Sequence, residues 1–334
     1  MDAAPSPAAG PLTALLRDAF GVQVHGVERV PAGTATDNVV VTTSDGARRF
    51  VKSYRTPGEV SAAVAAIELT EFAGAGGTPV PRVYRDASGG VVGQGYGLSV
   101  SVWELVEEAS TAEGGLRGDL WRAVGTTVGQ LHRHLATHPA GPPTTIPASA
   151  LVDLPAARAR YDRLVEEYRR SGVTDDFGAW AHDALVERRA LLPHVGGLLD
   201  ALPPLTVQTL HGDLAAPNVL VRGDAVAAVI DFQPPSAGYL AWEIARIACD
   251  PRTVVTTPGW QHGLSALLDA YETAYPAVRP ADLASVVAVG CAYTLASTYP
   301  LGAPVHDPHT VDDVLRTYAR QRHEAALVML DAVL

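Results

Sequence analysis

The sequence has little cysteine, and its two thiols form no recognisable pattern. Cys249 and Cys291 are the only cysteines among 334 residues, and both lie in apolar stretches with helical spacing. Disulfide scaffolds and metal-thiolate sites need cysteines at short, repeated spacings. The pattern counts against both classes and predicts two buried thiols of a cytoplasmic protein.

Long hydrophobic runs are also missing. No stretch approaches the roughly 20 consecutive apolar residues that span a bilayer. The segment from Met1 to Phe20 has neither the basic start nor the apolar centre of a signal peptide. We therefore expect no membrane span and no signal peptide, and we interpret the Pro- and Ala-rich start as a short tail.

Positive charge is scarce, and lysine is almost absent. The chain has 36 acidic and 25 basic residues, which gives a net charge of −11. Because binding to nucleic acid needs a positive surface, this charge argues against such a partner. Lys52 is the only lysine, so arginine supplies the other 24 basic residues (25 − 1).

The apolar pattern changes along the chain. Residues 23–103 contain alternating, strand-like segments, a hairpin turn at Ser44-Asp45-Gly46 and one helix over 59–77. From about residue 115 the spacing becomes helical, and the helix over 120–135 places five apolar residues on one face. The chain lacks a G-x-G-x-x-G motif and regular strand–helix alternation, which counts against a dinucleotide-binding fold.

These patterns predict an α+β fold with two lobes. We assign residues 1–22 to a tail and first helix, residues 23–103 to a small β-rich lobe, and residues 104–334 to a larger, mainly helical lobe.

The segment 210–232 contains an ordered set of polar residues. Asp213 follows His211 by two residues, Asn218 follows Asp213 by five, and Asp231 ends an apolar strand just before Phe232. Transfer of a phosphoryl group needs a carboxylate that orients the acceptor hydroxyl and oxygen ligands that hold Mg²⁺. The spacing matches the kinase pattern H-x-D-x-x-x-x-N followed by D-F.

This pattern predicts Asp213 as the catalytic base and Asn218 and Asp231 as the metal ligands. His211 is expected to brace the loop by hydrogen bonds. The alternative interpretation takes Asp213 and Asn218 as turn residues and Asp231 as the end of a strand.

Lys52 lies where a kinase needs a lysine. It belongs to a strand-like run upstream of a helix that carries Glu68 and Glu71. Kinases use a strand lysine to contact the α- and β-phosphates and a helix glutamate to hold that lysine. A compact ammonium group suits this task better than a planar guanidinium.

Together these residues resemble the aminoglycoside phosphotransferase and choline-kinase-like family over roughly residues 25–330. The resemblance rests on matching segments in both predicted lobes: Phe50-Val51-Lys52, Glu68, Thr78-Pro79-Val80-Pro81-Arg82-Val83, Leu131-His132, His211-Gly212-Asp213, Asn218-Val219-Leu220 and Ile230-Asp231-Phe232.

The resemblance implies a protein-kinase-like fold, with nucleotide in the small lobe and the acceptor in the helical lobe. It also implies ATP or GTP as donor, Mg²⁺ as cofactor and a hydroxyl-bearing small molecule as acceptor. Counting back from the Pro-Val-Pro segment places the family's helix glutamate at Glu68 rather than Glu71.

The chain departs from related patterns in three places. The phosphate-covering turn, 31–38, has one glycine, so Thr34 and Asn38 are the candidate phosphate contacts, and an ordinary polar turn is the alternative. No activation segment fits after Phe232, and Gly212 replaces an arginine of many protein kinases, which disfavours a protein substrate. Glu243 replaces the family's usual aspartate, and it either braces the catalytic loop or faces the surface.

The connector after residue 103 is the expected adenine site, with contacts near Glu104 and Val106. The acceptor stays open between an aminoglycoside-like or other amine-bearing compound and a metabolite such as homoserine, choline or a sugar. A nucleotide-binding pseudokinase is the alternative of another class. Acidic residues in 166–183 would suit a cationic acceptor, or they form solvated helix faces. We expect a monomer or a homodimer.

Overall fold

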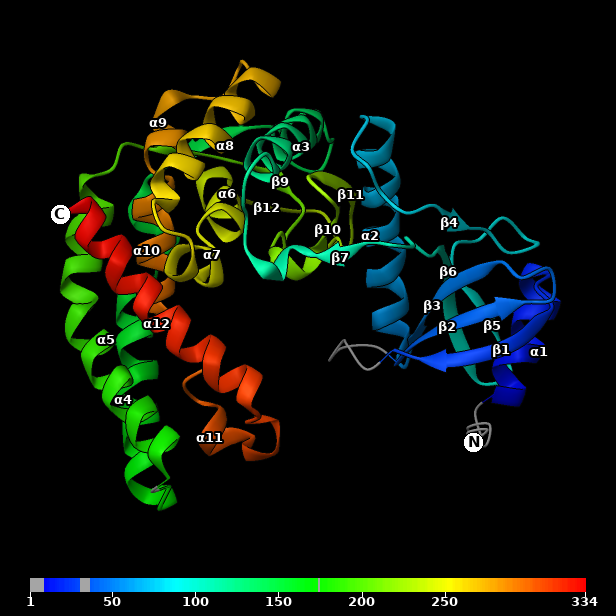
Figure 1. Cartoon of the computed structure of the whole chain (residues 1–334), viewed down its shortest axis with the longest axis horizontal. Coiled ribbons are helices and arrows are strands. Elements are labelled where there is room, and N and C mark those ends of the chain that lie inside the picture. The colour runs from blue at the N-terminus through cyan, green and yellow to red at the C-terminus, as the bar shows by residue number, and fades with distance from the viewer. Residues whose placement is uncertain (1–8, 31–36, 174) are drawn as a thin grey trace. The chain divides into compact units, whose positions relative to one another are not determined.

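The computed structural model describes residues 9–30, 37–173 and 175–334. They fall into two compact units, and Figure 1 labels most of their helices and strands. Unit 1 comprises Met1–Ser110, His211–Asp213 and Asn218–Pro235, and unit 2 comprises Thr111–Leu210, Leu214–Pro217 and Ser236–Leu334. The sequence-based division had placed the two later segments of unit 1 in the helical lobe.

Unit 1 is built on an antiparallel sheet with strand order β1-β2-β3-β6-β4, and β5 also pairs with β6. The strands are β1 Val24–Arg29, β2 Asp37–Thr43, β3 Arg48–Tyr54, β4 Val83–Tyr84, β5 Gly93–Gly95 and β6 Leu98–Glu104. The predicted turn at Ser44-Asp45-Gly46 joins β2 to β3, where the Gly46 N–H donates to the Thr43 carbonyl oxygen at 2.9 Å.

The two faces of this sheet have separate cores because successive side chains in a strand point to opposite sides. Val51 of β3 packs with Leu15 and Leu16 of α1 (Ala9–Phe20). Its neighbour Phe50 packs in the other core with Ile67 of α2 (Pro57–Ala75). The faces of β3 can therefore be named by these helices, the α1 face and the α2 face.

Helix α2 begins and ends two residues earlier than the predicted range of 59–77. Thr56 caps its N-terminus, where the hydroxyl oxygen accepts a hydrogen bond from the Glu59 N–H at 3.2 Å, and Pro57 occupies the first turn. At the other end Gly77 adopts a φ of +91°, a conformation that favours glycine after a helix.

A β-hairpin completes unit 1. It consists of β10 (Val219–Arg222) and β11 (Ala225–Val229), which pair antiparallel around a turn that includes Gly223. The Val229 N–H donates to the Pro79 carbonyl oxygen at 2.8 Å. This bond ties the hairpin to the segment between α2 and β4.

Unit 2 is mainly helical. Its helices are α3 Leu120–Leu135, α4 Leu154–Ser171, α5 Asp176–Ala201, α6 Leu240–Ala248, α7 Pro251–Thr256, α8 Trp260–Ala274, α9 Pro280–Ala284, α10 Val286–Ala296, α11 Ala303–His306 and α12 Asp313–Val333. Its described residues also include the short 3₁₀ turns Ala112–Gly114, Ala148–Leu151, Ala216–Asn218 and Pro308–Thr310, the third of which continues into unit 1. Strand β7 (Ser110–Thr111) lies where unit 1 passes into unit 2, and β8 (Thr144–Ile146), β9 (Leu205–Leu210) and β12 (Ser236–Tyr239) form a small antiparallel sheet.

Helices α3 and α8 pack closely. The predicted apolar face of α3 is buried throughout, from Leu120 to Leu135. A Cβ atom at Gly125 would lie 2.2 Å from the Leu267 carbonyl oxygen of α8. A glycine at this position therefore lets the two helix backbones approach.

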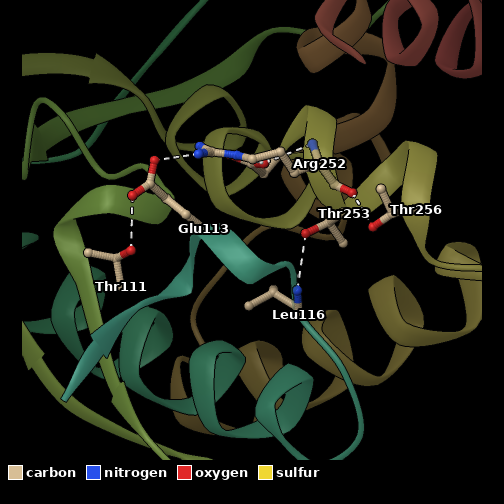
Figure 2. A network of polar contacts seen from close by, with 7 residues as sticks. Thr111, Glu113, Leu116, Arg252, Thr253 and Thr256 are labelled. Atoms are coloured by element: carbon tan, nitrogen blue, oxygen red, sulfur yellow. Dashed lines mark hydrogen bonds and ion pairs between the residues drawn. The ribbon is translucent and has the colours of Figure 1, made fainter. Parts of the chain in front are cut away.

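A polar network fixes the start of unit 2 (Figure 2). Arg252 of α7 holds Asp250, with Nε and Oδ1 3.0 Å apart, and it also forms an ion pair with Glu113. The Leu116 N–H donates to the Thr253 hydroxyl at 3.1 Å. These contacts anchor the segment after β7 on α7.

The predicted α+β class is confirmed by an antiparallel sheet in the N-terminal part and a largely helical C-terminal part. Across the described ranges, no helix is both long and apolar enough to cross a membrane.

Candidate active site

Lys52 lies on the α2 face of β3. Only Val51 separates it from Phe50, so both side chains share that face. In the sheet Lys52 pairs with Asn38 of β2 on one side and with Ser101 of β6 on the other. The side chain is 22% exposed, and its ammonium group forms an ion pair with the carboxylate of Asp231. A contact across 179 residues of sequence thus joins the two predicted groups.

Asp231 follows β11 in an unusual backbone conformation. Its φ is +62°, which non-glycine residues rarely adopt. The flanking residues are held by backbone hydrogen bonds, from the Ile230 N–H to the Asn218 carbonyl oxygen at 3.0 Å and from the Gln233 N–H to the His211 carbonyl oxygen at 2.9 Å. Strained conformations of this kind cluster at functional sites, where the surrounding structure maintains them.

Asp213 and Asn218 are hydrogen-bonded to each other. The Asn218 side-chain nitrogen donates to the main-chain oxygen of Asp213 at 2.8 Å and to its carboxylate at 3.1 Å. Both donor hydrogens of the amide therefore face Asp213, which leaves the amide oxygen of Asn218 for a different partner.

His211 braces the loop and carries no free proton-transfer nitrogen. Its Nδ1 accepts a hydrogen bond from the Asp213 N–H at 3.1 Å, and its Nε2 donates to the Ile230 carbonyl oxygen at 2.9 Å. This pattern requires a neutral ring with the proton on Nε2. The ring also packs on Phe232, with centroids 4.2 Å apart. The structure thus places His211 in the bracing position that the sequence predicts.

Position 212 accepts only glycine without strain. Its φ is +89°, and a Cβ atom there would lie 2.7 Å from the Cβ of Gln233. Both the backbone and the neighbouring side chain therefore oppose any other residue.

The other residues predicted to contact the nucleotide are not all found beside Lys52. Glu68 is exposed on α2, and no ion pair joins it to Lys52 in the part of the chain that the structure describes. Asn38 lies beside Lys52 in the sheet, whereas Thr34 lies outside the described residues. Their roles, and that of Glu68, stay predictions.

Glu104 and Val106 line a cavity of about 580 Å³ in unit 1. The Glu104 N–H donates to the Arg82 carbonyl oxygen at 2.8 Å. None of Lys52, Asp213, Asn218 and Asp231 lines this cavity. The adenine contacts predicted at Glu104 and Val106 therefore stay predictions as well.

Sequence reasoning missed Tyr54, which shares the face of Lys52. Its hydroxyl group lies 2.8 Å from the Ser101 Oγ, and Trp103 Nε1 donates to the same oxygen at 2.7 Å. Burial raises the pKa of the Tyr54 hydroxyl, and the negative charge of Asp231 raises it further. The i, i+2 spacing from Lys52 was the available signal.

Glu243 of α6 is fully buried, so the surface-facing alternative is wrong. Its carboxylate lies 3.0 Å from Nε2 of His132, and Nδ1 of His132 lies 2.9 Å from the Tyr271 hydroxyl. Burial raises the pKa of Tyr271 well above 10, so its hydroxyl stays protonated. The three side chains form a buried polar network inside unit 2.

Solved structures with similar folds include phosphotransferases for several antibiotics. A spectinomycin phosphotransferase in complex with ADP and spectinomycin has a TM-score of 0.70 at 14% identity, covering 97% of this chain and 98% of that chain. An amicoumacin kinase in complex with AMP-PNP, Ca²⁺ and Ami has a TM-score of 0.63 at 15% identity, covering 95% of this chain and 93% of that chain.

A macrolide 2′-phosphotransferase from Brachybacterium faecium has a TM-score of 0.52 at 16% identity, covering 97% of this chain and 98% of that chain. At these identities the similarity shows the fold, and it confirms the predicted kinase-like architecture. No curated protein matches the chain in a sequence comparison.

The sequence itself decides the family. The model of the phosphotransferase enzyme family matches residues 26–281, which include Lys52, Asp213, Asn218 and Asp231. The match covers well over half of the chain and spans both units. The chain therefore belongs to the phosphotransferase enzyme family, which includes the small-molecule kinases that its sequence resembles.

Proposed function

We propose that the protein transfers the γ-phosphate of ATP to a hydroxyl group of a small molecule. One observation carries the proposal: Lys52 lies far in sequence from Asp213, Asn218 and Asp231, yet all four belong to unit 1, where Lys52 contacts Asp231 and Asn218 contacts Asp213. Phosphoryl transfer depends on positioning and charge neutralisation, which such a set supplies.

Asp213 orients the acceptor hydroxyl and takes its proton as the oxygen attacks the γ-phosphorus. The bond between the γ-phosphorus and the bridging oxygen breaks, and ADP leaves. The hydrogen bond from Asn218 fixes the Asp213 carboxylate in one orientation. This fixed geometry matters because misplacement of a catalytic group by about 1 Å can cost roughly 100-fold in rate.

Asn218 and Asp231 fit Mg²⁺. The amide oxygen of Asn218 is turned away from Asp213, and the Asp231 carboxylate is 41% exposed, so both supply the hard oxygen ligands that Mg²⁺ prefers. Among the described residues, no group of three or more His, Cys, Asp or Glu could hold a metal alone. Mg²⁺ is commonly held by one or two protein ligands together with nucleotide phosphates. When bound, it would neutralise charge on the phosphate oxygens.

The charges of the helical part do not favour a polycationic acceptor. Glu166 pairs with Arg170 at 2.9 Å, and Glu167 lies 2.7 Å from His306. Asp175 caps α5 through the Gly178 N–H at 3.0 Å. These carboxylates are engaged by neighbouring groups, as the solvated-face alternative expects.

Similar folds that act on spectinomycin, amicoumacin and macrolides support an antibiotic or related amine-bearing compound as the acceptor. A metabolic acceptor such as homoserine, choline or a sugar is the second candidate. The acidic residues of the helical part favour neither acceptor, because their pairing with neighbouring groups says nothing about the charge of the acceptor. The cytoplasmic location, the state as monomer or homodimer, and the use of GTP stay predictions from the sequence.

A coupled assay should compare ADP release from Mg²⁺–ATP, and GDP release from Mg²⁺–GTP, across these acceptors. We expect turnover with at least one hydroxyl-bearing compound. Asp213→Asn should abolish that turnover and leave nucleotide affinity nearly unchanged. Asp224→Asn is the matched control, because Asp224 is an exposed turn residue of unit 1. Tight binding of Mg²⁺–ATP without turnover on any acceptor would favour the pseudokinase alternative.

A further inference from the structure

Tyr54 lies on the same face of the sheet as Lys52. Only Ser53 separates the two residues on β3, so both side chains point to the α2 face. On the neighbouring strand β6, Ser101 pairs directly with Lys52, and directly paired residues share a face. Trp103 of β6 lies in the core with α2. Four side chains of β3 and β6 therefore gather on this face.

The Tyr54 hydroxyl belongs to a short chain of hydrogen bonds. Trp103 Nε1 can only donate, and it donates to the Ser101 Oγ at 2.7 Å. The Ser101 Oγ also lies 2.8 Å from the Tyr54 hydroxyl oxygen, so one of these two hydroxyl groups donates to the other. The hydrogen of the accepting hydroxyl group has no acceptor among the residues that the structure describes.

Burial decides which hydroxyl group has the spare hydrogen. Ser101 is fully buried, and a buried donor without an acceptor is costly. Tyr54 is only half-buried, so its hydroxyl hydrogen can meet a partner that comes from outside the sheet. The favoured arrangement is therefore that Ser101 donates to Tyr54, and that the Tyr54 O–H is left to donate to a further acceptor.

The carboxylate of Asp231 is an acceptor near this hydroxyl group. Asp231 contacts Lys52, the neighbour of Tyr54 on the α2 face. The negative charge of Asp231 also raises the pKa of Tyr54, which places the carboxylate within electrostatic reach of the hydroxyl group. Burial raises the same pKa, so the hydroxyl group keeps its proton at neutral pH and can donate it in a hydrogen bond.

The proposed function takes Lys52 away from Asp231. A kinase lysine contacts the α- and β-phosphates of the nucleotide, and in the structure the same ammonium group is engaged by the Asp231 carboxylate. Glu68 does not hold the lysine in place, because it is exposed on α2 and forms no ion pair with Lys52 within the described ranges. Binding of nucleotide would therefore deprive the Asp231 carboxylate of a hydrogen-bond donor.

We propose that Tyr54 is a positioning residue whose hydroxyl group donates a hydrogen bond to the Asp231 carboxylate once Lys52 has turned to the phosphates. This hydrogen bond keeps the carboxylate in the orientation in which Asp231 serves as a ligand of Mg²⁺. Loss of a hydrogen bond to a metal-binding carboxylate typically costs about 10–100-fold in metal affinity or activity. The inference rests on the proposed function, because it gives Tyr54 a part in the same site.

The magnesium requirement of nucleotide binding tests the inference. Titration calorimetry on the full chain measures the affinity for a non-hydrolysable ATP analogue over a series of Mg²⁺ concentrations, and with a chelator in place of Mg²⁺. Tyr54→Phe removes the hydroxyl group and keeps the ring. Tyr96→Phe is the matched control, because Tyr96 is an exposed tyrosine of unit 1 whose hydroxyl group also donates to a carboxylate, that of Asp18. Circular dichroism and the unfolding midpoint show that each variant is folded.

We expect the Mg²⁺ concentration at half-maximal binding to rise about tenfold or more in Tyr54→Phe, whereas the affinity in chelator stays that of the parent. Excess Mg²⁺ should restore the affinity, because the hydrogen bond orients the carboxylate and does not itself touch the phosphates. Tyr96→Phe should bind as the parent does. An unchanged Mg²⁺ requirement in Tyr54→Phe, an equal loss of affinity in chelator, or the same rise in Tyr96→Phe would each overturn the inference.

Ser101→Ala provides a second test. It keeps the Tyr54 hydroxyl group and removes the oxygen that orients it, so we expect a smaller rise in the Mg²⁺ requirement. The double variant Tyr54→Phe/Ser101→Ala should match Tyr54→Phe within about twofold, since both changes act through one hydroxyl group. A larger rise in the double variant than in Tyr54→Phe would contradict the inference.

The parent protein separates this inference from the proposed function. If the parent shows Mg²⁺-dependent nucleotide binding and turnover, and Tyr54→Phe has the same Mg²⁺ requirement, only the role of Tyr54 fails. Absence of nucleotide binding by the parent would overturn both.

Discussion

Replacing Gly212 by alanine tests how the catalytic loop is held. At this position the backbone has a φ of +89°, and an added Cβ would lie 2.7 Å from Gln233 Cβ and 3.1 Å from Gln233 Cγ. Gly46 provides a matched control in the same unit, because its φ is +83° and nothing lies within 4 Å of an added Cβ. The two substitutions therefore share the backbone strain and differ in the steric clash.

The magnitudes follow from these two terms. A left-handed backbone costs an alanine about 1–2 kcal/mol, which is the whole expected cost of Gly46→Ala. Overpacking adds about 1–3 kcal/mol, because the obstructing atom is a Cβ that can move only with the backbone. We therefore expect Gly212→Ala to lower the free energy of unfolding by about 2–5 kcal/mol.

The clash also predicts a loss of activity that stability alone does not explain. Relief of the contact would push Gly212 away from Gln233, and Asp213 would move with it. The turnover number should fall by about 100-fold for a displacement near 1 Å. In Gly46→Ala it should stay close to that of the parent.

Urea unfolding and steady-state kinetics on both variants, and on the double variant Gly212→Ala/Gln233→Gly, separate these terms. The double variant removes the opposing Cβ. It should regain the unfolding free energy lost to the steric clash but not the part lost to backbone strain. Equal destabilisation by Gly46→Ala and Gly212→Ala, without recovery in the double variant, would refute the steric argument.

Three further predictions concern single residues. Lys52 is the only lysine, so an amine-reactive reagent has one side chain to modify; Mg²⁺–ATP should slow that modification in peptide mass spectrometry, and unchanged labelling would count against its role. Burial and the adjacent Arg188 lower the pKa of His323 in the folded protein below 6.5. As the pH falls, the unfolded chain therefore takes up the proton first, so the stability that the neutral ring contributes is present above pH 6.5 and is lost as the pH falls through the lowered folded pKa. His323→Gln should therefore reduce the change in unfolding free energy between about pH 7.5 and about pH 5.5. Glu243→Ala removes the carboxylate partner of Nε2 of the buried His132 and should cost about 3 kcal/mol in urea unfolding; a change below about 1 kcal/mol would contradict the importance of that network.

Much of the site could be predicted because its spacing is local. Asp213 and Asn218 lie five residues apart, close enough for one loop to hold them in a hydrogen bond whatever the rest of the chain does. The turn at Ser44-Asp45-Gly46 and the buried face of α3 follow from short-range patterns in the same way. Local chemistry of this kind is readable from sequence because it needs no knowledge of distant partners.

Contacts between distant segments could not be predicted. Lys52 pairs with Asp231 rather than Glu68, and that choice depends on side-chain conformations and on the packing of α2 against the sheet. Glu243 looked equally compatible with a surface position, since most glutamates are exposed. Its burial depends on His132, 111 residues earlier, which supplies the partner that a buried carboxylate needs.

The assignment of 218–235 to unit 1 has a similar origin. The hairpin of β10 and β11 follows a helical region in sequence, so its position along the chain suggests the helical lobe. The hydrogen bond from the Val229 N–H to the Pro79 carbonyl oxygen joins it instead to the segment after α2. Contacts of this kind between distant segments leave no trace in composition or periodicity.

The ion pair between Lys52 and Asp231 suits a lysine better than an arginine. The ammonium neutralises Asp231 through one compact contact. A guanidinium would engage both carboxylate oxygens in a fork and would be harder to displace. If Asp231 is to accept Mg²⁺ with nucleotide, the cation beside it has to exchange a carboxylate for phosphate oxygens at every turnover. A flexible stem with a point charge can make that exchange with small movements, so Lys52→Arg should weaken turnover more than it weakens folding.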